Sequence, residues 1–303
     1  MRTRFLVIAA FALPAMARAQ SLDLTIRHTG LSIGDSRFVR GVRLNFRDRN
    51  LELVEGINVT VWTPYEGSQG VVKGLAVGIP MTGAKHIEGA GIGVFGVGTE
   101  QDFTGIGVGG FGVGAGRDVK GIMIGGFGVG SGRNITGLTV GGFGAGAGGN
   151  VTGITIGGFG AGAGGDVTGL QIGGFGAGAG GDITGITLAG FGAGAGGTLR
   201  GYALAGLGVG APRIRGIVTA SAAGGEDVEG VILAPLYFKV ENNGRVKGVT
   251  VSAFNHVKGD QFGLSLGLLN YAWDVHGWQI GLLNYAGNNR KGLRLLPLFN
   301  RQW

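Results

Sequence analysis

Residues 150–165 read NVTGITIGGFGAGAGG, and residues 166–181 read DVTGLQIGGFGAGAGG. Six such 16-residue units follow one another over residues 102–197 without an insertion or deletion, and residues 198–213 form a degenerate seventh unit. A short fixed period is typical of repeat proteins, in which each unit buries its apolar residues only against its neighbours. The sequence therefore predicts a stack of repeated units in this central block.

A looser form of the unit, in which glycine is followed by an apolar, any and an apolar residue, extends through most of the chain. Its spacing varies outside the central block, and about eighteen units are expected in all. The glycines that begin these units are Gly30, Gly41, Gly56, Gly74, Gly91, Gly105, every sixteenth residue from there to Gly201, and then Gly216, Gly230, Gly248, Gly263, Gly277 and Gly292.

Within one unit, the apolar residues follow steps of two that are interrupted by steps of three. Ile154 and Ile156 share one face of a strand, whereas Phe159 follows the Gly157-Gly158 pair on the opposite parity. Glycine suits a corner between two strands because it reaches positive φ at little cost. The pattern predicts an all-β fold, a parallel β-solenoid of about 16-residue coils, in which like residues stack about 4.8 Å apart.

This interpretation places the apolar side chains of each coil in its interior. Ile154, Ile156 and Phe159 are expected inside, and Thr155, on the opposite parity from the two isoleucines, is expected outside. The interior would then hold a ladder of stacked phenylalanines, namely Phe111, Phe127, Phe143, Phe159, Phe175 and Phe191. A second ladder, near a corner, would consist of Thr136, Thr152, Thr168 and Thr184.

An outer-membrane antiparallel β-barrel of about 18 strands is the alternative fold. Such barrels have an even number of strands, and a 16-residue unit could hold one membrane strand and a turn. However, residues 102–197 contain no Trp or Tyr for interfacial aromatic girdles, and neither face of a unit is continuously apolar. Identical turns at every strand end also favour the solenoid, because the two rims of a barrel differ.

The first nineteen residues are typical of a secretory signal peptide. Arg2 and Arg4 precede a short apolar run, and Ala17-Arg18-Ala19 is a cleavage site of the small-x-small kind. The apolar run is shorter than the ~20 residues of a membrane-spanning helix. We therefore expect an exported bacterial protein at the cell surface or in the outer membrane, with the periplasm as a further location.

The composition supports a division of the chain into four parts. After the signal peptide at 1–19, irregular N-terminal repeats and a cap occupy 20–101, regular glycine-rich repeats 102–213, and divergent C-terminal repeats with a cap 214–303. Glycine accounts for 71 of the 303 residues, and cysteine is absent, which excludes disulfides and thiolate chemistry. The net charge of +7 includes three arginines of the signal peptide, and no dense basic stripe indicates a nucleic-acid partner.

The C-terminal repeats have a different sequence, in which GLLNYA occurs at 267–272 and again at 281–286. Over residues 262–303 the chain resembles a bacterial surface-repeat family, a group of uncharacterised exported proteins with tandem GLxxGLxN-type repeats. The resemblance implies an exported protein of the cell envelope or surface, and it supplies no activity and no catalytic residues. The central GGFGAGAGG block departs from the Leu-Leu-Asn pattern of that family.

No catalytic residue, cofactor or metal site is expected, and the protein is not expected to be an enzyme. The four histidines do not have the spacing of a zinc site, and the sequence contains no nucleophile elbow and no phosphate-binding loop. Recurrent Asp and Asn residues close the central units, and we interpret them as turn residues because their side chains bond to nearby backbone groups. These residues are Asp102, Asp118, Asn134, Asn150, Asp166 and Asp182.

A cluster of aromatic and Asn residues near the C-terminus is the candidate binding surface. Trp and Tyr combine a large apolar area with a polar tip, which suits contacts with carbohydrate or with another protein. Capping of the last coil is the alternative role, because solenoids need distinct terminal coils. The cluster consists of Asn270, Tyr271, Trp273, Trp278, Asn284 and Tyr285.

These observations favour an exported, non-enzymatic structural or adhesive repeat protein of the bacterial cell envelope or surface. The alternative function, which follows from the alternative fold, is that of an integral outer-membrane β-barrel acting as a pore or surface anchor. Envelope polysaccharide, lipid and another copy of the chain remain open as partners, and so does association with a membrane. Nucleic acid is not expected as a partner.

Overall fold

The structure is a computed structural model that describes residues 21–302 except 63 and 65–69. The chain divides into two compact units, Met1–Gly125 and Gly126–Trp303, which we call unit 1 and unit 2. The predicted signal peptide lies outside the described residues. Both units consist of β-strands, apart from one short 3-10 helix in unit 2 among the residues described.

In unit 1, strand β2 pairs with β1 in the antiparallel direction, and all later pairings of the unit are parallel. One ladder runs β2–β3–β4–β5–β7–β9–β11, and a second ladder of short strands runs β6–β8–β10. The strands are β1 Ser21–Ile26, β2 Thr29–Gly34, β3 Phe38–Asn45, β4 Leu53–Thr60, β5 Val71–Gly78, β6 Met81–Ala84, β7 His86–Gly93, β8 Gly96–Thr99, β9 Phe103–Gly109, β10 Gly112–Ala115 and β11 Val119–Gly125.

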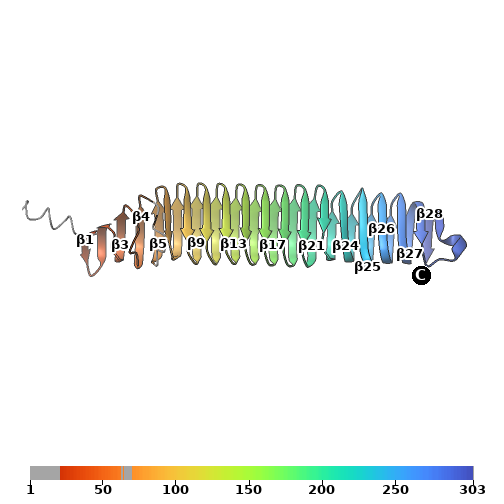
Figure 1. Cartoon of the computed structure of the whole chain (residues 1–303), viewed down its shortest axis with the longest axis horizontal. Helices are drawn as coiled ribbons and strands as arrows, with labels where there is room; N and C mark the ends of the chain where they lie inside the picture. The colour runs from red at the N-terminus through yellow and green to blue at the C-terminus, as the bar shows by residue number, and fades with distance from the viewer. Residues whose placement is uncertain (1–20, 63, 65–69, 303) are drawn as a thin grey trace, which may run out of the picture. The chain divides into compact units, whose positions relative to one another are not determined.

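In unit 2, long and short strands alternate along the chain, and each strand pairs in parallel with the equivalent strand of the next coil (Figure 1). The central strands are β12 Gly128–Ser131, β13 Ile135–Gly141, β14 Gly144–Ala147, β15 Val151–Gly157, β16 Gly160–Ala163, β17 Val167–Gly173, β18 Gly176–Ala179, β19 Ile183–Ala189, β20 Gly192–Ala195, β21 Thr198–Ala205, β22 Gly208–Gly210 and β23 Arg213–Thr219.

Towards the C-terminus of unit 2 the short and long strands merge, so that one strand serves both ladders across a register shift. The last strand, β28, is antiparallel to β27 and ends the parallel ladder. These elements are β24 Ala222–Leu233, β25 Tyr237–Val251, β26 Phe254–Leu266, β27 Leu269–Ala286, the 3-10 helix η1 Lys291–Leu293 and β28 Leu295–Gln302.

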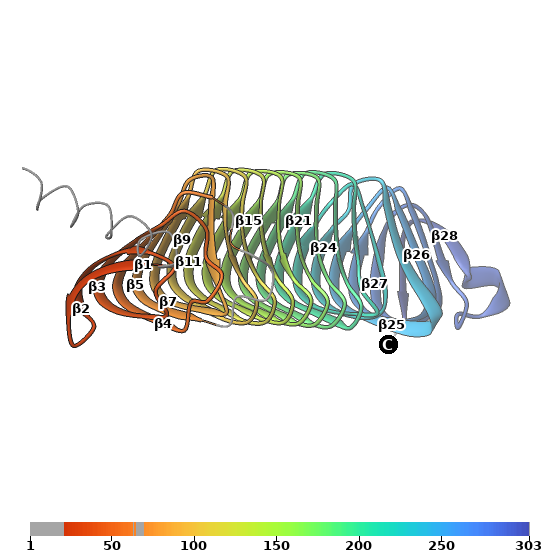
Figure 2. The ribbon, with the colours of Figure 1, turned by 60° about the vertical axis from the view of Figure 1, so that its left-hand side comes forward.

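The fold is therefore an all-β parallel β-solenoid with coils about 16 residues apart, as predicted. In β13, β15 and β17 the register joins Thr139 to Thr155 and Thr155 to Gln171, which is one repeat per coil. Parallel pairing of consecutive units is incompatible with an antiparallel barrel, so the alternative fold is wrong. The successive central coils, drawn in green, repeat the same outline (Figure 2).

A glycine with a positive φ occupies the same register position in successive coils, and these glycines form a column. Gly153 has a φ of +121°, and a Cβ atom there would lie 2.2 Å from the carbonyl oxygen of Gly137 in the preceding coil. Only glycine fits such a position without strain. The predicted column is confirmed, except that Gly89 (φ +136°) takes the place of Gly91, and Gly292 lies in η1.

The assignment of inner and outer side chains within a coil is wrong. Thr155 is completely buried, whereas Ile154 is 40% exposed and Phe159 is 49% exposed. The inward positions of the coil hold small residues such as Val151 and Ala161, so the two ladders enclose a thin interior. The error lies in the choice of parity, because Val151 and Thr155 point inward whereas Ile154 and Ile156 point outward, and in other coils the same inward positions hold Ile135, Ile183 and Gln171.

The predicted stacking of like residues is confirmed even where the predicted burial is not. Phe159 lies between Phe143 and Phe175, with ring centroids 4.9 and 4.7 Å away and the rings nearly parallel. Thr152 pairs in register with Thr136 and Thr168 on the outer face. The stacked phenylalanines thus form an exposed ridge rather than a core.

The Asp and Asn column joins adjacent coils. The N–H of Asp166 donates to Asn150 Oδ1 (2.8 Å), and the N–H of Asp182 donates to Asp166 Oδ1 (2.7 Å). Each side chain therefore satisfies a backbone donor at the same corner of the next coil, where no strand pairing is available. This agrees with the interpretation of these residues as turn residues.

Candidate interaction surfaces

The two asparagines of the predicted binding surface lie in the interior of unit 2. Asn270 is 2% exposed and Asn284 is completely buried. Asn255 Nδ2 donates to Asn270 Oδ1, and Asn270 Nδ2 donates to Asn284 Oδ1, both at 2.7 Å. Their placement on a surface is therefore wrong. A signal was present in the sequence, because Asn255, Asn270 and Asn284 recur at nearly the coil spacing and so mark one stacked position.

Three of the predicted aromatic residues lie together. The rings of Tyr271 and Tyr285 stack with their centroids 4.9 Å apart, and Trp273 Nε1 donates to the hydroxyl of Tyr271 (2.8 Å). Trp273 is 42% exposed. Because Tyr271 pairs in register with His256, the group continues towards Tyr237 as an aromatic strip on the outer face of this part of the solenoid.

Trp278 belongs to a different surface. It pairs in register with Leu264, in the outward column that contains Ile154 in the central coils, and it is 37% exposed. The guanidinium carbon of Arg301 lies 5.0 Å from the centre of its ring, which is a cation–π arrangement. The predicted cluster is thus divided between the interior and two outer surfaces.

His256 connects the rings of the aromatic strip. Its Nδ1 lies 3.0 Å from the hydroxyl of Tyr237, and its ring stacks on Phe254 with centroids 5.2 Å apart. Burial lowers the pKa of His256 below its ordinary value, and the positive charges of Lys258 and Lys239 lower it further. The imidazole is therefore neutral near pH 7. The strip consists of Tyr237, Phe254, His256, Tyr271, Trp273 and Tyr285.

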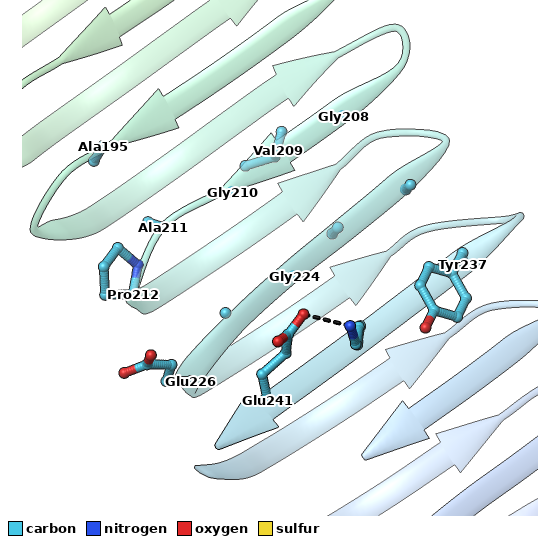
Figure 3. A pocket seen from close by; sticks show the side chains of 14 residues that line it. Ala195, Gly208, Val209, Gly210, Ala211, Pro212, Gly224, Glu226, Tyr237 and Glu241 are labelled. Carbon is cyan, nitrogen blue, oxygen red and sulfur yellow. Dashed lines mark ion pairs between the residues drawn. The ribbon is translucent and has the colours of Figure 1, made fainter. Parts of the chain in front are cut away.

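A hollow of about 650 Å³ lies beside this strip, where the glycine-rich short strands meet Tyr237 (Figure 3). Gly208, Gly210 and Gly224 contribute backbone to its lining. Glu241 forms an ion pair with Lys239 beside it, and the hydrogen bond between them lowers the pKa of Glu241 and raises that of Lys239. The hollow is therefore lined by glycine backbone on one side and by the side chains of Tyr237, Lys239 and Glu241 on the other.

The outward positions of the short strands carry no side chain, and we call this surface the glycine face. It is formed by the glycines of β14, β16, β18, β20 and β22. A Cβ atom on Gly162 would meet only the carbonyl oxygen of Gly178, at the ordinary distance of 3.7 Å. Contacts within the chain therefore do not require glycine at position 162, in contrast to Gly153.

The outward positions of the long strands in unit 2 carry aliphatic side chains instead. Two columns run from coil to coil, one through Ile154 and Leu170 and the other through Ile156 and Ile172. We call these two columns, together with the phenylalanine ridge at the corner that follows each long strand, the apolar face. The ridge consists of Phe127, Phe143, Phe159, Phe175 and Phe191, which are between 48% and 54% exposed.

Unit 1 has a buried ionic cluster that the sequence analysis missed. The side chain of Arg43 is completely buried and pairs with Asp48, which is equally buried, and with Asp35 at 2.8 Å. Thr60 Oγ1 donates to Asp48 Oδ2 (2.6 Å), so the carboxylate is fully engaged. A buried ion pair of this kind is kept by its additional hydrogen bonds, and we assign it to the structure of the terminal coils.

The described residues contain no group of three His, Asp or Glu side chains that could hold a metal ion. No helix within the described ranges has the length and apolar character needed to cross a membrane. Comparison of the chain with family models, with curated proteins and with solved structures gives no match. The class defined by the fold is that of tandem β-solenoid repeat proteins, and the resemblance to the surface-repeat family stays a prediction.

Proposed function

We propose that the protein is an exported, non-enzymatic structural or adhesive repeat protein of the bacterial cell envelope or surface. One observation carries the proposal, namely that the regular coils present periodic outer faces of backbone, aliphatic and aromatic groups. The apolar and glycine faces repeat the same groups from coil to coil. A periodic flat surface suits extended contact with another surface, whereas catalysis needs unlike groups that converge on one point.

The signal peptide supports the cellular location that this function requires. Arg2, Arg4 and the Ala17-Arg18-Ala19 site indicate export, and the mature chain is then expected to begin at Gln20. The absence of cysteine removes any dependence of the exported chain on disulfide formation.

The test combines cell fractionation with an adhesion assay in a bacterium that expresses the protein. The wild-type protein is expected in the envelope fraction with Gln20 as its first residue, accessible to protease on intact cells and released by alkaline carbonate. A variant that lacks residues 2–19 is the matched control and is expected to stay in the cytosol. Cells with the exported protein should adhere to one another or to a surface more than control cells do.

Two results would contradict the proposal. One is a chain that keeps Met1 and stays in the cytosol. The other is an exported protein whose removal changes neither adhesion nor the detergent resistance of the envelope.

A further inference from the structure

The apolar face of unit 2 is larger than a soluble monomer normally exposes. A phenylalanine side chain has an area of about 200 Å², so five half-exposed rings contribute roughly 500 Å². The two aliphatic columns add about as much again, since Ile154 and Ile186 of one column are 40% and 46% exposed and Leu204 of the other is 38% exposed. The largest apolar patch of a typical monomer is ~300–600 Å², and larger patches mark interaction sites.

This area matches what one partner contributes to a stable protein complex. A standard interface buries ~800 Å² on each side, and the apolar face offers about 1,000 Å². The face is also flat and regular, because Ile154, Leu170 and Ile186 occupy the same register position in consecutive strands. Two such sheets can pack face to face about 10 Å apart, with side chains of equal spacing on both sides.

Charged side chains of both signs border the apolar face, and two ion pairs form among them. The column beside it contains Arg200, Arg215, Glu229 and Lys247, and the last two lie 3.6 Å apart. At the neighbouring corner, Arg245 Nε pairs with Asp227 Oδ1 at 2.8 Å. Membrane-surface proteins instead border their apolar face with Lys and Arg. Ion pairs of both signs are typical of the polar rim of a protein–protein interface.

We propose that the apolar face of unit 2 docks onto the same face of a second copy of this chain. A two-fold symmetric pair buries both faces, because one surface serves both partners and the coil spacing is the same in each. The Thr column at the edge of the face, which contains Thr152 and Thr168, is uncharged up to Thr184, and Arg200 and Arg215 follow it only towards the C-terminal end of the face. The inference rests on the proposed structural function and specifies its partner.

The test measures the mass of the purified protein by analytical ultracentrifugation over a range of concentrations. The wild type is expected to sediment as a dimer. Ile154→Glu combined with Ile186→Glu places charges on the apolar face, and we expect the dimer dissociation constant to rise at least ~100-fold. Both side chains are 40% or more exposed, so the folded chain accommodates the change.

Gly162→Glu combined with Gly192→Glu is the matched control. It adds the same two charges to the same two coils on the glycine face, where an added Cβ would meet only a carbonyl oxygen at 3.7–3.8 Å. This variant should remain dimeric, and circular dichroism should show the same strand content in all three proteins. A monomeric wild type, a dimer that survives the two Ile substitutions, or a dimer lost only in the glycine control would overturn the proposal.

Vesicles of phosphatidylglycerol and phosphatidylethanolamine test lipid as the occupant. Co-sedimentation of a monomeric wild type with these vesicles, abolished by the two Ile substitutions, would assign the face to lipid and overturn the proposal. A monomer that is nevertheless exported and adhesive contradicts only the dimer. A dimer that remains in the cytosol contradicts only the proposed function.

Discussion

The central coils and the C-terminal coils of unit 2 share one backbone frame but fill it differently. At the inward position of the short strand, the central coils carry Ala161 and Ala177, whereas the C-terminal coils carry Asn255 and Asn270 at the corresponding register. The positive-φ glycine continues unchanged from Gly153 into the C-terminal coils. The glycine column and the parallel ladder therefore define the coil, and the inward side chains can vary around them.

We expect the largest loss of stability from substitution of a glycine in the glycine column. In Gly153→Ala the new Cβ would lie 2.2 Å from the Gly137 carbonyl oxygen at a φ of +121°, so we expect a loss of about 3 kcal/mol or more. Gly162→Ala is the control within the same coil, and it should be neutral or stabilise by about 0.5 kcal/mol. Urea denaturation of both variants measures the difference, and equal losses would contradict it.

The C-terminal interior contains stacked amides, those of Asn255, Asn270 and Asn284, which we call the amide ladder. Asn270→Ala leaves the buried amides of Asn255 and Asn284 without one hydrogen-bond partner each, and we expect a loss of about 2–4 kcal/mol. Thr155→Val in the central coils should cost less than about 1 kcal/mol, because Thr155 Oγ1 is buried without a hydrogen-bond partner in the described part of the chain.

The same denaturation experiment checks the amide-ladder prediction. If Thr155→Val destabilises as strongly as Asn270→Ala, the central interior depends on polar contacts as much as the C-terminal interior does.

The smallest expected change in stability is a pH dependence that arises from His256 in the C-terminal coils. Burial, Lys258 and Lys239 hold the pKa of His256 below its ordinary value of 6.5, although Glu241 acts in the opposite direction. As the pH falls through 6.5, the unfolded chain binds a proton before the folded chain does, so the free energy of unfolding decreases.

His256→Gln should flatten this dependence between pH 7 and pH 5, as measured by urea denaturation at each pH. A wild type that becomes more stable over that interval would show that protonated His256 is favoured in the fold.

The period of the sequence was enough to predict the solenoid, its register and nearly all of the glycine column. It was not enough to assign the inner face, because Ile154 and Ile156 are the most apolar residues of the unit and yet alternate with the buried Thr155. Lack of room does not explain this, because the inward positions of other coils hold Ile135, Ile183 and Gln171. Both faces of the strand carry apolar residues, so hydrophobicity alone does not distinguish the inner face from the outer one.

The candidate surface was predicted in part for a related reason. Asn270 and Asn284 are polar and would cost free energy if each were buried alone. Stacking places one amide directly over the next, so that each donates to its neighbour and burial becomes acceptable. That compensation depends on the coil register as well as on the amide itself, so it cannot be recognised from a single residue. Trp273 and Tyr271 were found because aromatic residues are recognisable without the register.

The antiparallel strand β28 has a consequence for how the gene can change in length. The central coils of unit 2 are nearly interchangeable in sequence, and among the strands that the structure describes β28 pairs with β27 alone. Recombination between repeats of a gene adds or removes whole 16-residue units, and each such event leaves the last coil and its reversed strand intact. We expect the length of the array to be the most readily altered trait of this gene, with the ends inherited unchanged.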